Sequence, residues 1–172
     1  MSEIVNKVKQ SKLVTIDLEK LIEGERVEEI DLKQFLFQGL ILKEKEFRDQ
    51  LTEFDWKSYT GANIALFCSA DAIIPSWAWM LVTTCLQPYA KEIVYGNRDE
   101  LRKELLYRKI SENDWNVYRD KFVLMKGCSK AKVPEGAYLE ATKKLLPVAG
   151  KIMYGEACSN VPVYKKPREA RP

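Results

Sequence analysis

Asp55-Trp-Lys-Ser-Tyr59 and Asp114-Trp-Asn-Val-Tyr118 open two similar stretches of the chain. Each opening is followed by an apolar run that ends in Cys-Ser, at 68–69 and 128–129, and then by Pro75 or Pro134. Pro-x-Ala and Ile-x-Tyr-Gly close both stretches, at 88–96 and 147–155. The offset is 59 residues at every landmark except the Cys-Ser pair, where it is 60. This periodicity predicts an internal duplication.

Both copies have the pattern helix–strand–helix–strand. Charged segments with spaced apolar residues predict amphipathic helices, and short runs rich in Ile, Phe and Val predict buried strands. The prolines mark where the second helix of each copy begins. The predicted helices are 43–54, 75–90, 99–111 and 134–149, and the predicted strands are 62–67, 91–95, 121–126 and 151–154.

Strands that are joined by helices run parallel with right-handed crossovers. We therefore expect an α/β fold with one mainly parallel sheet of about four strands, covered by helices. The duplicated domain spans 43–163, with copies at 43–96 and 99–155. Residues 1–42 form an N-terminal extension packed on this domain, with a candidate strand at 13–18 and a short helix capped by Asp31. Residues 164–172 form a flexible basic tail.

Composition excludes several functions. The chain has no histidine, which excludes Ser-His-Asp and Cys-His catalysis as well as histidine-ligated metal sites. Twenty-eight Lys and Arg against 25 Asp and Glu leave a net charge of +3, too small to indicate a nucleic-acid partner. Residues 72–86 are too few and too interrupted to span a membrane, and no secretory signal is visible. The cytoplasm is the expected compartment.

Three cysteines lie where predicted strands end. Cys68 and Cys128 end the first and third strands, and Cys158 follows the fourth. Ligands bind beyond the carboxyl ends of parallel strands, so one sheet would bring these thiols to the same edge. Thiolates favour zinc and iron–sulfur clusters. The sequence therefore predicts a metal site formed by Cys68, Cys128 and Cys158, with an iron–sulfur cluster or zinc as the cofactor.

Polar residues near these thiols complete the predicted site. Ser69, Ser129 and Ser159 each directly follow a cysteine, and Asp71 is the best candidate for a fourth ligand or a hydrogen-bonding group. Cys85 lies in an apolar helical stretch and is interpreted as a packing residue.

Two other interpretations stay open, and whether the protein is an enzyme is not decided by the sequence. In the first, one thiol reacts covalently, as in a cysteine enzyme or a sulfur carrier. In the second, the protein is a non-catalytic interaction module whose cysteines are structural, because cysteine packs as a small hydrophobic residue.

Four segments resemble a bacterial family known as domain of unknown function 2480. They are Glu3-Ile-Val-Asn-Lys7, Gly39-Leu-Ile-Leu-Lys-Glu-Lys-Glu-Phe-Arg48, Cys68-Ser-Ala-Asp-Ala-Ile-Ile-Pro75 and Tyr154-Gly-Glu-Ala-Cys-Ser-Asn-Val-Pro162. The resemblance covers nearly the whole chain but implies no reaction and no catalytic residue. Genes of the family often lie near genes for iron–sulfur cluster assembly. The resemblance therefore implies a role in cluster assembly or delivery, with iron–sulfur assembly proteins as partners.

Overall fold

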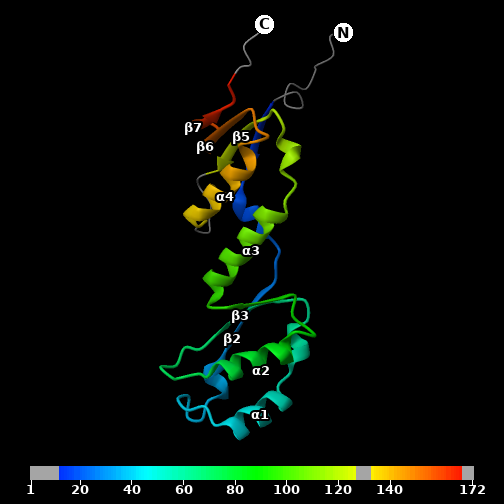
Figure 1. Cartoon of the computed structure of the whole chain (residues 1–172), viewed down its shortest axis with the longest axis vertical. Coiled ribbons are helices and arrows are strands. Elements are labelled where there is room, and N and C mark those ends of the chain that lie inside the picture. The colour runs from blue at the N-terminus through cyan, green and yellow to red at the C-terminus, as the bar shows by residue number, and fades with distance from the viewer. Residues whose placement is uncertain (1–11, 127–132, 168–172) are drawn as a thin grey trace. The chain divides into compact units, whose positions relative to one another are not determined.

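A computed structural model describes residues 12–126 and 133–167. The α/β class is confirmed, because the described residues form four α-helices and two sheets. In chain order the elements are β1 (Leu13–Ile16), η1 (Leu18–Ile22), β2 (Val27–Asp31), η2 (Leu32–Phe35), α1 (Glu44–Glu53), η3 (Trp56–Tyr59), β3 (Asn63–Phe67), α2 (Ser76–Leu86), β4 (Glu92–Tyr95), α3 (Arg98–Glu112), η4 (Trp115–Tyr118), β5 (Phe122–Lys126), α4 (Glu135–Leu145), β6 (Lys151–Glu156) and β7 (Ser159–Lys165), as Figure 1 shows. Among the described residues, no helix combines the length and the apolarity needed to cross a membrane.

The chain divides into two compact units. One, the inserted unit, is the continuous segment Gly24–Leu105. The other, the flanking unit, is formed by the described residues before 24 and after 105. The boundary falls inside α3, so this one helix contributes to both units.

The inserted unit is built on a parallel three-stranded sheet with the order β2-β3-β4. Ile64 and Leu66 on β3 belong to an apolar core that also includes Phe47 of α1 and Val82 of α2, so both helices cover one face of this sheet. Ala65 points to the opposite face and is also fully buried. Burial on both faces explains why the sequence of β3 is continuously apolar.

The flanking unit has a mixed four-stranded sheet with the order β1-β5-β6-β7. The first three strands are parallel, and β7 pairs antiparallel with β6. A two-residue turn, Ala157 and Cys158, makes this hairpin, which only antiparallel strands allow. The sequence analysis missed β7, because most of its side chains are exposed and leave no alternating apolar pattern.

The prediction of one sheet is wrong. Strands β3 and β5, expected in a single sheet, belong to different sheets. The reason lies in residues 1–42, which we expected to form an extension. Its segment 13–16 pairs with β5 and its segment 27–31 pairs with β3, so each expected copy has its own first strand. Residues 1–11 and 168–172 lie outside the described part, and Tyr164 and Lys165 of the expected tail are the last residues of β7.

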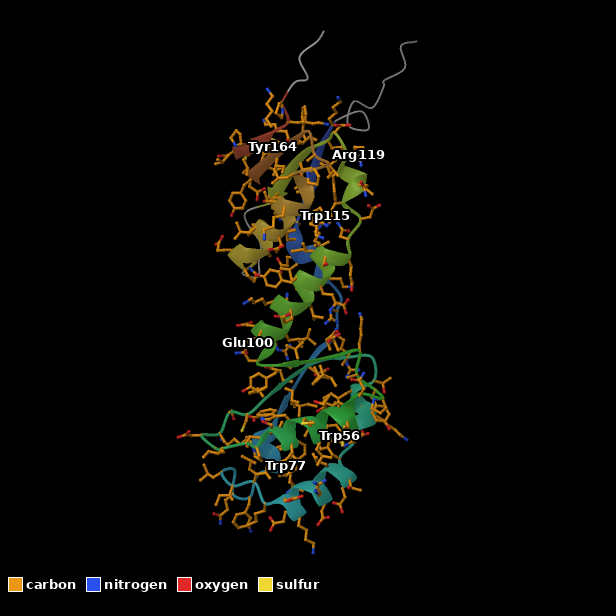
Figure 2. The ribbon with its side chains drawn as sticks, in the orientation of Figure 1. Trp56, Trp77, Glu100, Trp115, Arg119 and Tyr164 are labelled. Carbon is orange, nitrogen blue, oxygen red and sulfur yellow. The ribbon has the colours of Figure 1, made fainter. Side chains whose placement is uncertain are left out.

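The two units repeat one buried contact. The indole nitrogen of Trp56 donates to the carbonyl oxygen of Leu51 at 2.7 Å, and that of Trp115 donates to Ile110 at 2.8 Å (Figure 2). Leu51 and Ile110 lie near the carboxyl ends of α1 and α3, where helix carbonyls lose their intrahelical partners. These contacts account for both Asp-Trp motifs, while the duplication itself stays a prediction.

The Trp contacts generate a stability prediction. Trp56→Phe and Trp115→Phe keep an aromatic ring but remove the indole donor, leaving a helix-terminal carbonyl unpaired. Each change is expected to lower the free energy of unfolding by about 1–2 kcal/mol in urea titrations. Trp77→Phe is the control, because the Trp77 ring contacts Phe47 and Arg48 through its face and edge. Equal stability of all four proteins would contradict the role assigned to these hydrogen bonds.

Candidate functional site

Cys68 follows β3 directly and packs inward. Its side chain is half-buried against the apolar core of the inserted unit, and its Sγ lies 3.9 Å from the carbonyl oxygen of Ala70. Asp71, the expected fourth ligand, is exposed in the loop that follows. The environment of Cys68 is therefore that of a packing thiol, which matches the structural interpretation of the cysteines.

Ser69 is held by Asp31 across the carboxyl ends of β2 and β3. The Asp31 carboxylate accepts hydrogen bonds from the Ser69 backbone nitrogen at 2.9 Å and from its hydroxyl at 2.5 Å. Burial raises the pKa of Asp31, but hydrogen bonds from the side chain and backbone of Ser69 and from the backbone of Lys33 outweigh it. The net result is a lowered pKa, so the carboxylate stays charged and fixes the loop.

Polar side chains also contact one another at the carboxyl ends of the strands in the flanking unit. Lys126, at the end of β5, lies with its Nζ 3.4 Å from Asp17, which follows β1. The Tyr138 hydroxyl donates to the Lys126 carbonyl at 3.2 Å, and its ring contacts Tyr154 edge-on at 5.3 Å. Burial and, secondarily, the charge of Tyr154 and of nearby carboxylates raise the pKa of Tyr138 to about 12. Cys128 and Ser129 lie outside the described residues.

Cys158 lies in the turn between β6 and β7. It is exposed, and Ser159 behind it begins β7 in register with Glu156. The turn belongs to the flanking unit, whereas Cys68 belongs to the inserted unit.

The structure does not support the predicted metal site. The expectation that three thiols share one edge required a single sheet, but Cys68 follows β3 of one sheet and Cys158 lies in the turn after β6 of the other. Within residues 12–126 and 133–167, no group of three or more Cys, Asp or Glu side chains could hold a metal ion. Neither an iron–sulfur cluster nor zinc therefore has a site among the described residues, where Ser69 and Asp71 lie in the loop after β3.

One hollow of about 440 Å³ opens on the flanking unit, between α3 and α4. It is lined by Tyr107, Ile110, Ser111, Gly136, Leu139, Glu140 and Lys144. Its acidic group, Glu140, is already paired with Lys143 at 2.7 Å. The hollow is an open groove between helices, and its lining does not converge on one point as a small-molecule site does.

The most unusual surface lies on α2 of the inserted unit. Ile73, in the loop before α2, is 96% exposed, and Met80 in the middle of the helix is 68% exposed. Met80 shares its helix face with Ser76 and Thr84, which are four residues before and after it. Tyr95, 75% exposed at the end of β4, contacts Trp79 edge-on at 5.1 Å. We call Ile73, Ser76, Trp77, Trp79, Met80, Thr84 and Tyr95 the α2 surface.

The α2 surface lacks charged side chains. The nineteen residues 72–90 contain no Asp, Glu, Lys or Arg. Helix α4, which follows β5 as α2 follows β3, has Glu135, Glu140, Lys143 and Lys144. A helix with one solvated face normally has charges there, as α4 does. The two helices therefore differ in their solvent-exposed faces: that of α4 has charged side chains and that of α2 has none.

The sequence patterns did not identify this surface. Residues 72–86, part of the uncharged run 72–90, were interpreted only as too few and too interrupted to span a membrane. An apolar helix that is buried on all sides has the same sequence pattern. Only the exposed fractions of Ile73, Met80 and Tyr95 show that this helix has an exposed apolar face.

Comparison with known proteins places the chain in a family. A family model described as protein of unknown function (DUF2480) matches residues 2–166. The chain belongs to the DUF2480 family. No curated protein and no solved structure matches it. The DUF2480 match spans every strand and helix described above, including both N-terminal strands, and assigns no activity.

The Asp31–Ser69 contact predicts a pH-dependent stability in this DUF2480 chain. Because the pKa of Asp31 is lower in the folded chain than in the unfolded chain, its contribution is present above about pH 4 and is lost as the pH falls through the folded value. Ser69→Ala is expected to lower the free energy of unfolding by about 1 kcal/mol at pH 7 and by less near pH 3. Asp71→Asn, in the same loop, is the matched control, and a Ser69→Ala effect independent of pH would contradict the assignment.

Thiol accessibility predicts the order of alkylation. Cys158 is exposed, whereas Cys68 and Cys85 are partly buried against the core. With iodoacetamide at pH 8, followed by peptide mass spectrometry, Cys158 is expected to react about tenfold faster than Cys68 and Cys85. Faster modification of Cys68 would contradict the packing role and favour a reactive thiol.

Proposed function

We propose that the protein is a non-catalytic interaction module and that the α2 surface is where it docks another protein surface. One observation carries the proposal: an uncharged helix exposes Met80 at its centre, next to Ile73 and Tyr95, which are among the most exposed large apolar side chains of the described residues. An exposed apolar patch of this kind typically marks an interaction site.

The energetics favour coverage of this surface by protein. Fully burying a large apolar side chain stabilises a complex by about 1.5–3 kcal/mol relative to leaving it in water. Trp77 and Trp79, already half-buried, have rings fixed by Phe47 and Tyr95, so they lose little further conformational freedom on binding. Methionine adapts its shape to a partner at small cost. The α2 surface thus combines rigid aromatic side chains with one adaptable centre.

The geometry gives less support to the two alternatives. A metal- or cluster-binding function needs Cys68, Cys128 and Cys158 together, and nothing in the described residues brings them together. A thiol enzyme needs an accessible and activated thiol, and Cys68 packs against the core instead. The interaction module needs no thiol chemistry at all.

A site-specific photo-crosslinker tests the proposal. Met80 is replaced by p-benzoylphenylalanine in the full chain, which is then irradiated in the cells that produce it. The probe is expected to give one discrete protein adduct, identified by mass spectrometry of both crosslinked peptides. The matched control carries the probe at Leu139, which is 64% exposed on the charged helix α4.

The two positions discriminate sharply because both side chains are exposed at mid-helix. A position-80 yield at least about tenfold above the position-139 yield supports docking at the α2 surface. Equal yields, or no adduct at position 80, would contradict the proposed function.

A further inference from the structure

We infer that the partner on the α2 surface is a second copy of this chain, with the two α2 helices crossing at Met80. The inference rests on the proposed function and adds the identity of the partner. Three properties of the surface lead to it: its charge, its symmetry about Met80 and its size.

Charge is the first property. An isologous interface places the same patch against itself, so a charged patch meets its own like charge. Residues 72–90 bring no charge into such a contact, and 31% of the whole chain is charged. A second α2 surface therefore meets the first without like-charge repulsion and without burying an unpaired charge.

Symmetry is the second property. Ser76, Met80 and Thr84 form one ridge at four-residue spacing along the exposed face of α2. The large side chain is at the centre and a small one lies one turn away on either side. In a two-fold crossing at Met80, each Ser76 faces the Thr84 of the other copy, and the small residues leave room for the two methionines. Ridges of this spacing interdigitate when helices cross at about −50°.

Size is the third property. An eleven-residue helix is about 16 Å long, and a standard interface buries about 800 Å² on each partner. A single helix crossing covers less than that. Ile73, 96% exposed in the loop before the helix, and Tyr95, 75% exposed against Trp79, add to the apolar area. We therefore expect both side chains to belong to the interface.

Other surfaces of the chain are less suited to self-association. Strand β7 has a free edge, but Pro162 within it lacks a backbone donor and Lys165 at its end adds charge, two features that prevent edge pairing. The groove between α3 and α4 is bordered by Glu140 and Lys144. None of the residues that define the α2 surface is charged.

Sedimentation equilibrium of the full chain tests the inference. From about 1 µM to about 1 mM protein, the wild-type chain is expected to shift from monomer to dimer. Met80→Glu is expected to weaken dimerisation by about 30-fold or more, because it places two carboxylates against each other at the two-fold axis. Leu139→Glu, an equivalent change on α4, leaves dimerisation unchanged. Unfolding curves of both variants establish that each is folded.

A disulfide trap locates the axis. Met80→Cys in a background with both Cys128→Ser and Cys158→Ser, which leaves Cys68 and Cys85 as the partly buried native thiols, is expected to form an 80–80 disulfide dimer on mild oxidation. Leu139→Cys in the same background is the control. A wild-type chain that stays monomeric, or a dimer whose linkage avoids position 80, would overturn the inference.

The outcomes separate the two proposals. If the chain is monomeric and the photo-probe at position 80 captures a different protein, the proposed function stands and the second copy is excluded as partner. If the chain is monomeric and the probe captures nothing, both are contradicted.

Discussion

The structure depends on the parallel pairing of two short strands near the N-terminus with strands far along the chain. Leu13 lies opposite Phe122, and Val27 lies opposite Asn63. Because the two N-terminal strands join different partners, the chain forms two sheets, each with its own carboxyl edge. The Asp31–Ser69 hydrogen bonds close the end of one such pair and keep the following loop in place. This pairing therefore decides at which sheet edge the residues that follow β3 and β5 lie.

Because of the same pairing, the thiols do not form one site, and the α2 surface is the candidate site instead. With β3 and β5 in different sheets, Cys68 becomes one residue of a local core, where its thiol packs like a small apolar group. The surface that then stands out is defined by exposure rather than by reactive chemistry, because Met80 on the uncharged helix α2 and Ile73 in the loop before it are both exposed. Exposed apolar area of this kind lowers solubility unless it is covered, which is why an interaction explains it better than catalysis does.

Much of the local structure could be predicted from the sequence, and the tertiary arrangement could not. Amphipathic periodicity located α1 and α3, and apolar runs located β3 and β5, because local patterns of burial are visible in a single sequence. Strand β2 was missed, since Glu28 and Glu29 hide its alternation. The number of sheets depends on which strands pair, and this choice is made by non-local contacts that periodicity does not encode. The α2 surface was not identified, because the exposure of Met80 depends on tertiary packing that a single sequence does not reveal.

Strand pairing is the central claim, and cross-strand nuclear Overhauser effects in isotopically labelled protein measure it most directly. The account predicts contacts between the backbones of Glu29 and Ala65, and between those of Thr15 and Leu124, which lie in register in the two sheets. We expect both contacts to be present and no contact between β3 and β5. Backbone contacts between Ala65 and Leu124 would place β3 and β5 side by side in one sheet, and the account would be wrong.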